Sequence, residues 1–115
     1  MSPNLKKLRI RLEYRCIGSD DYVTCIREIA RMRDPDAIRV LARMLDSSGP
    51  IAVAAMDALV RFGEAAVPAM ERCTRSYDGE MTRHAEQVLA RVARQTARRA
   101  AAAAKNAVPT VTAAG

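Results

Sequence analysis

The sequence predicts an all-α protein made of paired helices, and its composition gives the first two indications. Half of the 115 residues are apolar, yet only 3% are aromatic and tryptophan is absent, so the core must be aliphatic. The frequent Ala, Arg and Met favour helices, whereas the β-branched and aromatic residues that favour strands are sparse. Glycine and proline, five of each, fall mostly between apolar runs, where helices would end.

A repeat of 30 residues is the third indication. Segments 24–34, 54–64 and 84–94 align without gaps. The aligned residues are Ile29, Leu59 and Leu89, then Ala30, Val60 and Ala90, then Arg31, Arg61 and Arg91, then Met32, Phe62 and Val92. A second helical segment precedes each of these three. The predicted helices span residues 3–16, 20–33, 35–46, 50–62, 65–76 and 79–105.

Turn and capping residues lie where helix pairs require them. Ser2 followed by Pro3 is typical of a helix start, and Asp34 with Pro35 repeats that arrangement. Pro68 is tolerated only in the first turn of a helix, which places the start of its helix near residue 65.

Apolar residues form one stripe on the second helix of each pair. The stripe of the middle pair is Ile51, Ala55, Ala58, Leu59 and Phe62, and that of the last pair is Met81, Ala85, Val88, Leu89 and Val92. The middle helix carries a second stripe, formed by Val53, Met56 and Val60. Because a helix with neighbours on both sides needs a wider apolar surface, we expect this helix at the centre of a linear stack.

Residues 34–73 resemble the HEAT-like repeats of the phycobilisome-lyase type. These repeats pair an outer helix similar to A-V-P-A-L with an inner helix similar to V-x-x-A-A-x-A-L-x-R-L-G. The outer pattern matches residues 37–41 and 66–70, the inner pattern matches residues 51–63 and 81–93, and the likeness covers about 20–93. The first helix, 3–16, matches only loosely, as a terminal cap would.

The resemblance implies a short α-solenoid of about three HEAT-like helix pairs, an α/α superhelix whose inner helices line a concave surface. The expected domain covers residues 1–105, with pairs at about 3–33, 35–62 and 65–105. We expect residues 106–115 to form a disordered tail.

The net charge of +6 is concentrated at the two ends of the chain. Residues 1–15 contain five basic residues and one acid, and residues 94–115 contain four basic residues and no acid, so each end carries +4. The middle, 16–93, holds ten basic and twelve acidic residues, a charge of −2. This distribution weakens the case for a protein that binds nucleic acid over its whole surface.

The arginine column Arg31, Arg61 and Arg91 is the most regular polar feature of the predicted inner face. It could hold carboxylates or phosphates at even spacing. A structural role is the favoured interpretation, because the arginine belongs to the repeat pattern itself, each arginine lies near a helix C-terminus, and Asp57 can pair with Arg61 one turn on. The same face would also present Arg27, His84 and Gln87, a mixed and weakly basic surface suited to a protein partner with acidic groups.

The C-terminal helix carries a second basic group, consisting of Arg94, Arg98, Arg99 and Lys105. Three of these fall near one helix face, with Arg99 beside them. The group could bind nucleic acid or an acidic protein, although a solubilising terminus is the favoured interpretation.

No residues suggest an enzyme, a metal or a cofactor. His84 is the only histidine and is expected to be exposed. The three cysteines, Cys16, Cys25 and Cys73, are not spaced like metal ligands, and we expect them to be reduced thiols. HEAT-like hydroxylases need several His-Glu pairs, and HEAT-like DNA glycosylases need an Asp among aromatic residues, neither of which occurs here. Bilin lyases of this repeat type are larger chains.

The location expected from the sequence is cytoplasmic. No stretch approaches the roughly 18 continuous apolar residues that a membrane span needs. The N-terminal segment lacks the apolar core of a secretory signal, although its Arg-rich start also resembles a mitochondrial transit peptide.

Two functions remain after these exclusions. The leading one is an interaction scaffold that docks a protein partner on its repeat surface and self-associates through the ends of the solenoid. The alternative is a nucleic-acid-associated accessory protein that binds through its basic termini.

Overall fold

The computed structural model describes the backbone of residues 1–114 and the side chains of residues 1–106, and it confirms the all-α prediction. The helices are α1 (Pro3–Tyr14), α2 (Gly18–Arg31), α3 (Ala37–Arg43), α4 (Gly49–Phe62), α5 (Val67–Cys73) and α6 (Gly79–Ala114). Two 3-10 turns, η1 (Met44–Asp46) and η2 (Gly63–Ala66), follow α3 and α4. No strand occurs within residues 1–114.

The predicted helix starts are correct for α1 and α6, differ by one residue for α4, and are wrong by two residues for α2, α3 and α5. The Ser2 hydroxyl accepts a hydrogen bond from the Leu5 backbone N–H at 3.2 Å, as an N-cap does. Asp34 does not cap α3, because its carboxylate instead accepts from the Asp36 N–H at 3.0 Å and closes a turn ahead of the helix. The 3-10 turn η2 delays α5 to Val67, which leaves Pro68 in the first turn.

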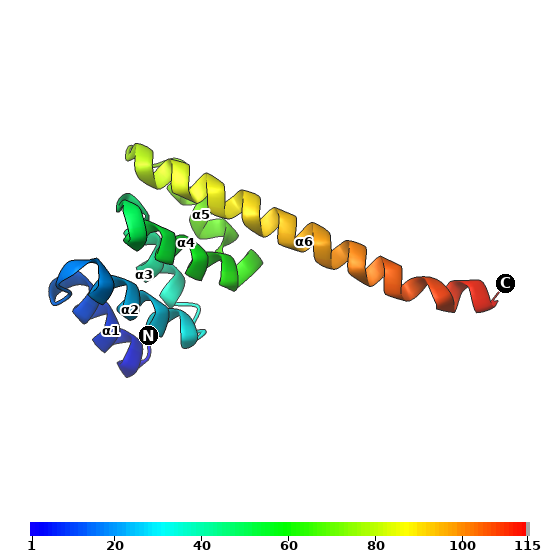
Figure 1. The fold of residues 1–115 in the computed structure, drawn as a ribbon, viewed down its shortest axis with the longest axis horizontal. Helices are drawn as coiled ribbons and strands as arrows, with labels where there is room; N and C mark the ends of the chain where they lie inside the picture. The colour runs from blue at the N-terminus through cyan, green and yellow to red at the C-terminus, as the bar shows by residue number, and fades with distance from the viewer. Residues whose placement is uncertain (115) are drawn as a thin grey trace.

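Helix α4 lies at the centre of the molecule, as its wide apolar surface predicts (Figure 1). It packs against α2 on one side and α6 on the other. Helix α3 packs against α4, α5 packs against α6, and α3 and α5 pack on each other. α1 packs on α2 at one end. The buried residues of α4 are Ala52, Ala55, Met56, Ala58, Leu59 and Val60, whereas Val53 of the predicted second stripe is 52% exposed.

Helix α6 extends beyond the body formed by the other helices (Figure 1). Its last buried side chain is Val92, and every side chain from Ala97 to Asn106 is exposed. Its backbone continues to Ala114, past the expected end near Lys105. The predicted disordered tail, 106–115, falls almost entirely outside the residues whose side chains are described, and it stays a prediction.

None of the described helices combines the length and the apolar composition that crossing a lipid bilayer requires.

Asp21 joins α1, the following turn and α2 through its carboxylate. Arg11 Nη2 donates to Asp21 Oδ1 at 2.7 Å, and the Ile17 backbone N–H donates to Oδ2 at 3.1 Å. The hydrogen bond from Arg11, followed by that from Ile17, lowers the pKa of the Asp21 carboxyl below its ordinary value. A carboxyl whose pKa is lowered by folding stabilises the fold above its ordinary pKa, and this contribution is lost as the pH falls through the lowered value.

Asp21→Asn is therefore expected to destabilise the protein at neutral pH and to make its stability less sensitive to acid below about pH 4. Thermal unfolding followed by circular dichroism at a series of pH values measures both effects. Asp20→Asn is the control, because it removes the same charge from the adjacent exposed residue. Identical pH profiles for the two variants would contradict the role assigned to Asp21.

Candidate partner-binding face

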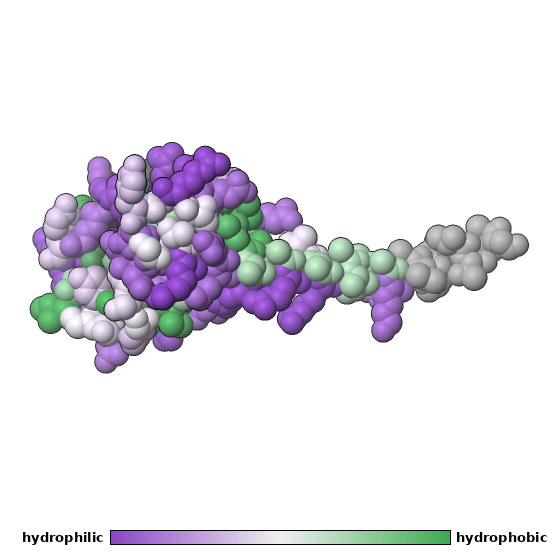
Figure 2. Space-filling model, turned by 90° about the horizontal axis from the view of Figure 1, so that it is seen from above, coloured by the Kyte–Doolittle hydropathy of each residue, from purple (hydrophilic) through white to green (hydrophobic). Residues whose placement is uncertain are grey.

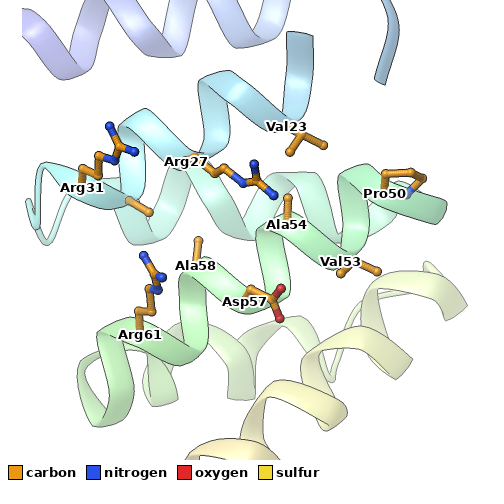
Figure 3. Close-up of a pocket in the computed structure, with 10 residues that line it drawn as sticks. Val23, Arg27, Arg31, Pro50, Val53, Ala54, Asp57, Ala58 and Arg61 are labelled. Carbon is orange, nitrogen blue, oxygen red and sulfur yellow. The ribbon is translucent and has the colours of Figure 1, made fainter. Parts of the chain in front are cut away.

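The exposed side of α2 and α4 forms a groove that contains two of the three arginines in the predicted column. Its volume is about 470 Å³. The groove is lined by Val23, Arg27, Ala30, Arg31, Pro50, Val53, Ala54, Asp57, Ala58 and Arg61 (Figure 3). We call this hollow the α2–α4 groove.

Small residues on the two helices open the α2–α4 groove. Ala30 of α2 and Ala54 and Ala58 of α4 line its floor, where larger side chains would fill the space. Arg27 and Arg31 project from α2 and Arg61 projects from α4, so that guanidinium groups stand over an apolar floor (Figure 3). This combination can hold an acidic segment that also carries apolar side chains.

The predicted Asp57–Arg61 pair is wrong, and the actual pairing makes the arginine column unequal. Asp57 Oδ1 accepts instead from Arg91 Nη1 of α6 at 2.9 Å. Arg91 is thus neutralised by a contact between neighbouring helices. Arg31 and Arg61 make no ion pair with any residue whose side chain is described, so they remain available to an anion.

His84 is not part of this face, contrary to the expectation from the sequence. It is only 7% exposed, and its Nδ1 donates to the Leu45 carbonyl oxygen at 2.8 Å, because η1 packs against α6 at this point. A carbonyl oxygen can only accept, so Nδ1 carries the proton. Gln87 is exposed on α6 but does not line the α2–α4 groove.

A second hollow, of about 570 Å³, continues from the α2–α4 groove towards α6. It is lined by Ala30, Arg31, Arg33, Val60, Arg61, Phe62, Gln95 and Arg99. We call it the arginine pocket, because four of its eight lining residues are arginines and none is acidic. Arg33 was not singled out from the sequence. The alignment places it opposite Gly63, and this unusual exchange of glycine for arginine is the signal that could have identified it.

The predicted basic group of α6 is divided by the fold. Arg99 lines the arginine pocket with Gln95. Arg94, Arg98 and Lys105 are exposed and line none of the hollows described here. The projecting part of α6 carries hydrophilic side chains along one edge and alanines along the other (Figure 2).

An apolar hollow lies where α6 leaves the body. Its apolar lining residues are Val67, Pro68, Leu89, Val92, Ala93, Ala97 and Ala100. A green, hydrophobic area is visible at this junction, and the pale green alanine side of α6 continues from it (Figure 2). This hollow lies at one of the two ends through which self-association was expected, and that expectation stays a prediction.

The cysteines are poor candidates for nucleophiles because burial keeps them protonated. Burial raises the pKa of all three thiols, that of Cys25 to about 12. Cys25 is fully buried, and its Sγ donates to the Leu8 carbonyl oxygen at 3.4 Å. Within the residues described, no three His, Cys, Asp or Glu side chains gather as they would around a metal ion.

Comparison with known proteins adds no further constraint. No protein-family model matches the chain, and no curated protein and no solved structure is significantly similar to it.

Proposed function

We propose that this protein is an interaction scaffold, a short HEAT-like α-solenoid whose inner helices α2, α4 and α6 dock an acidic protein partner. The order of packing supports the proposal, because α2, α4 and α6 are successive neighbours and α3 and α5 lie against each other behind them. Alternating inner and outer helices are characteristic of such repeats, which commonly use the inner surface for binding.

The observation that carries the proposal is that Arg31 and Arg61 are exposed and unpaired among the described residues. Both also line the α2–α4 groove. By contrast, Arg11 of α1 is paired with Asp21 of α2 across the contact between these helices. Guanidinium groups left unpaired over an apolar floor suit carboxylates presented by another protein.

Charge reversal in the groove is expected to remove the partner. Tagged wild-type protein and the double variant Arg31→Glu/Arg61→Glu are compared as baits in a quantitative pull-down read by mass spectrometry. A genuine partner is expected to fall by at least about tenfold, because reversing two contact charges costs several kcal/mol. Crosslinks from that partner to α2 or α4 of the wild type would place it on the groove.

The matched control is Arg39→Glu/Arg72→Glu, which makes the same charge change at exposed positions of α3 and α5. Circular dichroism spectra of all three baits check that they are folded. If every captured protein is retained equally by the groove variant and the control, the groove is not the docking site and the proposal fails.

Nucleic acid is the weaker candidate ligand. The exposed Arg94, Arg98 and Lys105 of α6 favour it, since they follow one another along one helix face without an intervening acid. The arginine pocket offers little to stacked bases, because its only aromatic residue, Phe62, is half-buried. Acids also border the arginine-lined face, namely Asp57 in the α2–α4 groove and Glu64 beside Arg61 and Arg99.

A further inference from the structure

We propose that the arginine pocket is a binding site for the carboxylate side chains of an acidic peptide segment. The inference rests on the proposed function, and it names the chemistry of the partner and the place where its acidic part binds. Four guanidinium groups supply the charge, and the apolar Ala30, Val60 and Phe62 supply a floor.

The arginines of the pocket come from separate parts of the chain. Arg31 and Arg33 stand at the end of α2, Arg61 near the end of α4, and Arg99 on α6. None of the four makes an ion pair within the residues whose side chains are described. Like charges gathered in one hollow repel one another, so the fold brings them together at a cost that a bound anion removes. Arginine is also the side chain best suited to holding carboxylates through paired hydrogen bonds.

The backbone at Arg33 gives an independent reason to assign a function to this side chain. Its φ is +55°, and it is the only residue other than glycine with a positive φ among those described. Thirty residues later, Gly63 ends α4 with a φ of +65°. A side chain in the left-handed region costs about 1–2 kcal/mol, which glycine avoids. The protein therefore keeps an arginine at a position where glycine would be more stable, and strain of this kind is typical of functional positions.

The surroundings of the pocket favour a peptide over a longer polyanion. Arg31, Arg61 and Ala30 line both the pocket and the α2–α4 groove, so the two form one continuous track. Asp57 lies along that track, and Glu64, whose Oε1 accepts from Thr96 Oγ1 at 3.3 Å, lies beside the pocket. A uniformly charged backbone would be repelled by Glu64, which makes no ion pair within the residues whose side chains are described, whereas the charge of Asp57 is already paired with Arg91. A peptide avoids this repulsion by placing apolar side chains beside Glu64 and its carboxylates on the arginines.

Direct binding tests the proposal. The probe is a short fluorescein-labelled peptide with leucines spaced among glutamates, and its anisotropy is measured with the full chain at about 50 mM salt. The otherwise identical peptide with glutamine in place of glutamate is the uncharged control. We expect the acidic peptide to bind and the glutamine peptide not to bind. The double variant Arg33→Gly/Arg99→Gln is expected to bind the acidic peptide at least about tenfold more weakly.

A loss of folding cannot mimic this result. Arg33→Gly relieves the strained φ, so the single variant is expected to melt at or above the temperature of the wild type while binding more weakly. The matched control, Arg39→Gln/Arg72→Gln, removes the same charge from exposed positions of α3 and α5 and is expected to change the affinity by less than about twofold.

Three results would overturn the proposal. The first is that the wild type does not bind the acidic peptide. The second is that the matched control loses as much affinity as Arg33→Gly/Arg99→Gln. The third is that a single-stranded DNA oligonucleotide displaces the peptide and that the binding of this DNA depends on Arg33 and Arg99. The last result would assign the pocket to nucleic acid. If the peptide experiment fails while Arg31→Glu/Arg61→Glu still removes a protein partner, only this inference is wrong. If the peptide binds in the pocket but no partner depends on the groove, the proposed function is the one that fails.

Discussion

Replacing Leu59 with alanine is expected to lower the free energy of unfolding by about 2–5 kcal/mol, the largest effect of any single change considered. Leu59 is fully buried in α4, the helix that packs against α2, α3 and α6. Removing its side chain leaves a cavity that three neighbouring helices would have to close together, which close packing resists. Urea unfolding followed by circular dichroism measures the loss.

Leu89→Ala is the matched control for this prediction. Leu89 occupies the same position of the repeat 30 residues later, but on α6 it is only half-buried at the edge of the apolar hollow. The same substitution is therefore expected to cost clearly less than at Leu59. Equal losses at the two positions would show that the central place of α4 does not determine the contribution of this residue.

His84→Leu is expected to cost about 1–3 kcal/mol of stability, although leucine fills the same apolar surroundings. The Leu45 carbonyl would lose the hydrogen bond that it receives from His84 Nδ1 at 2.8 Å, and that oxygen belongs to a fully buried residue. The substitution thus separates the hydrogen bond from the packing. The measurement is again the free energy of unfolding.

Gln87→Leu, on the exposed surface of the same helix about one turn away, is the control and is expected to change stability by less than about 0.5 kcal/mol. If the His84→Leu variant is as stable as the wild type, the hydrogen bond from His84 to the Leu45 carbonyl has no structural role. Loss of partner binding by a stable His84→Leu variant would restore His84 to the binding face.

The repeat in the sequence was sufficient to predict the helices and the central position of α4. A 30-residue period with helical stripes constrains each segment in a similar way, so the aligned Ile29 and Leu59 are both fully buried, whereas the third aligned residue, Leu89, is half-buried on α6. The boundaries at α3 and α5 were less predictable. Asp34 can cap a helix or close a turn with the same oxygen, and the 3-10 turn η2 depends on how α4 ends at Gly63.

The candidate site was only partly predictable, because contacts between helices determine which of its charged side chains are paired and which are free. Arg31 and Arg61 lie together in the α2–α4 groove, as their alignment suggested. The same alignment could not tell whether Asp57 would pair along its own helix with Arg61, as the spacing of four residues allows, or with Arg91 of the neighbouring helix, as it does. His84 was misjudged for a related reason. Its aligned counterpart Thr24 is exposed, whereas η1 covers α6 at His84.

The projecting end of α6 also determines how this protein moves through solution. Its radius of gyration is 17.2 Å, against about 13 Å for a compact domain of this length, and its longest dimension of 63 Å is about twice the next. A particle of this shape experiences more friction than a sphere of the same mass. Gel filtration calibrated with globular standards therefore overstates the mass of a monomer, which is 12.6 kDa. A method that reports mass independently of shape, such as static light scattering, is needed to count the subunits.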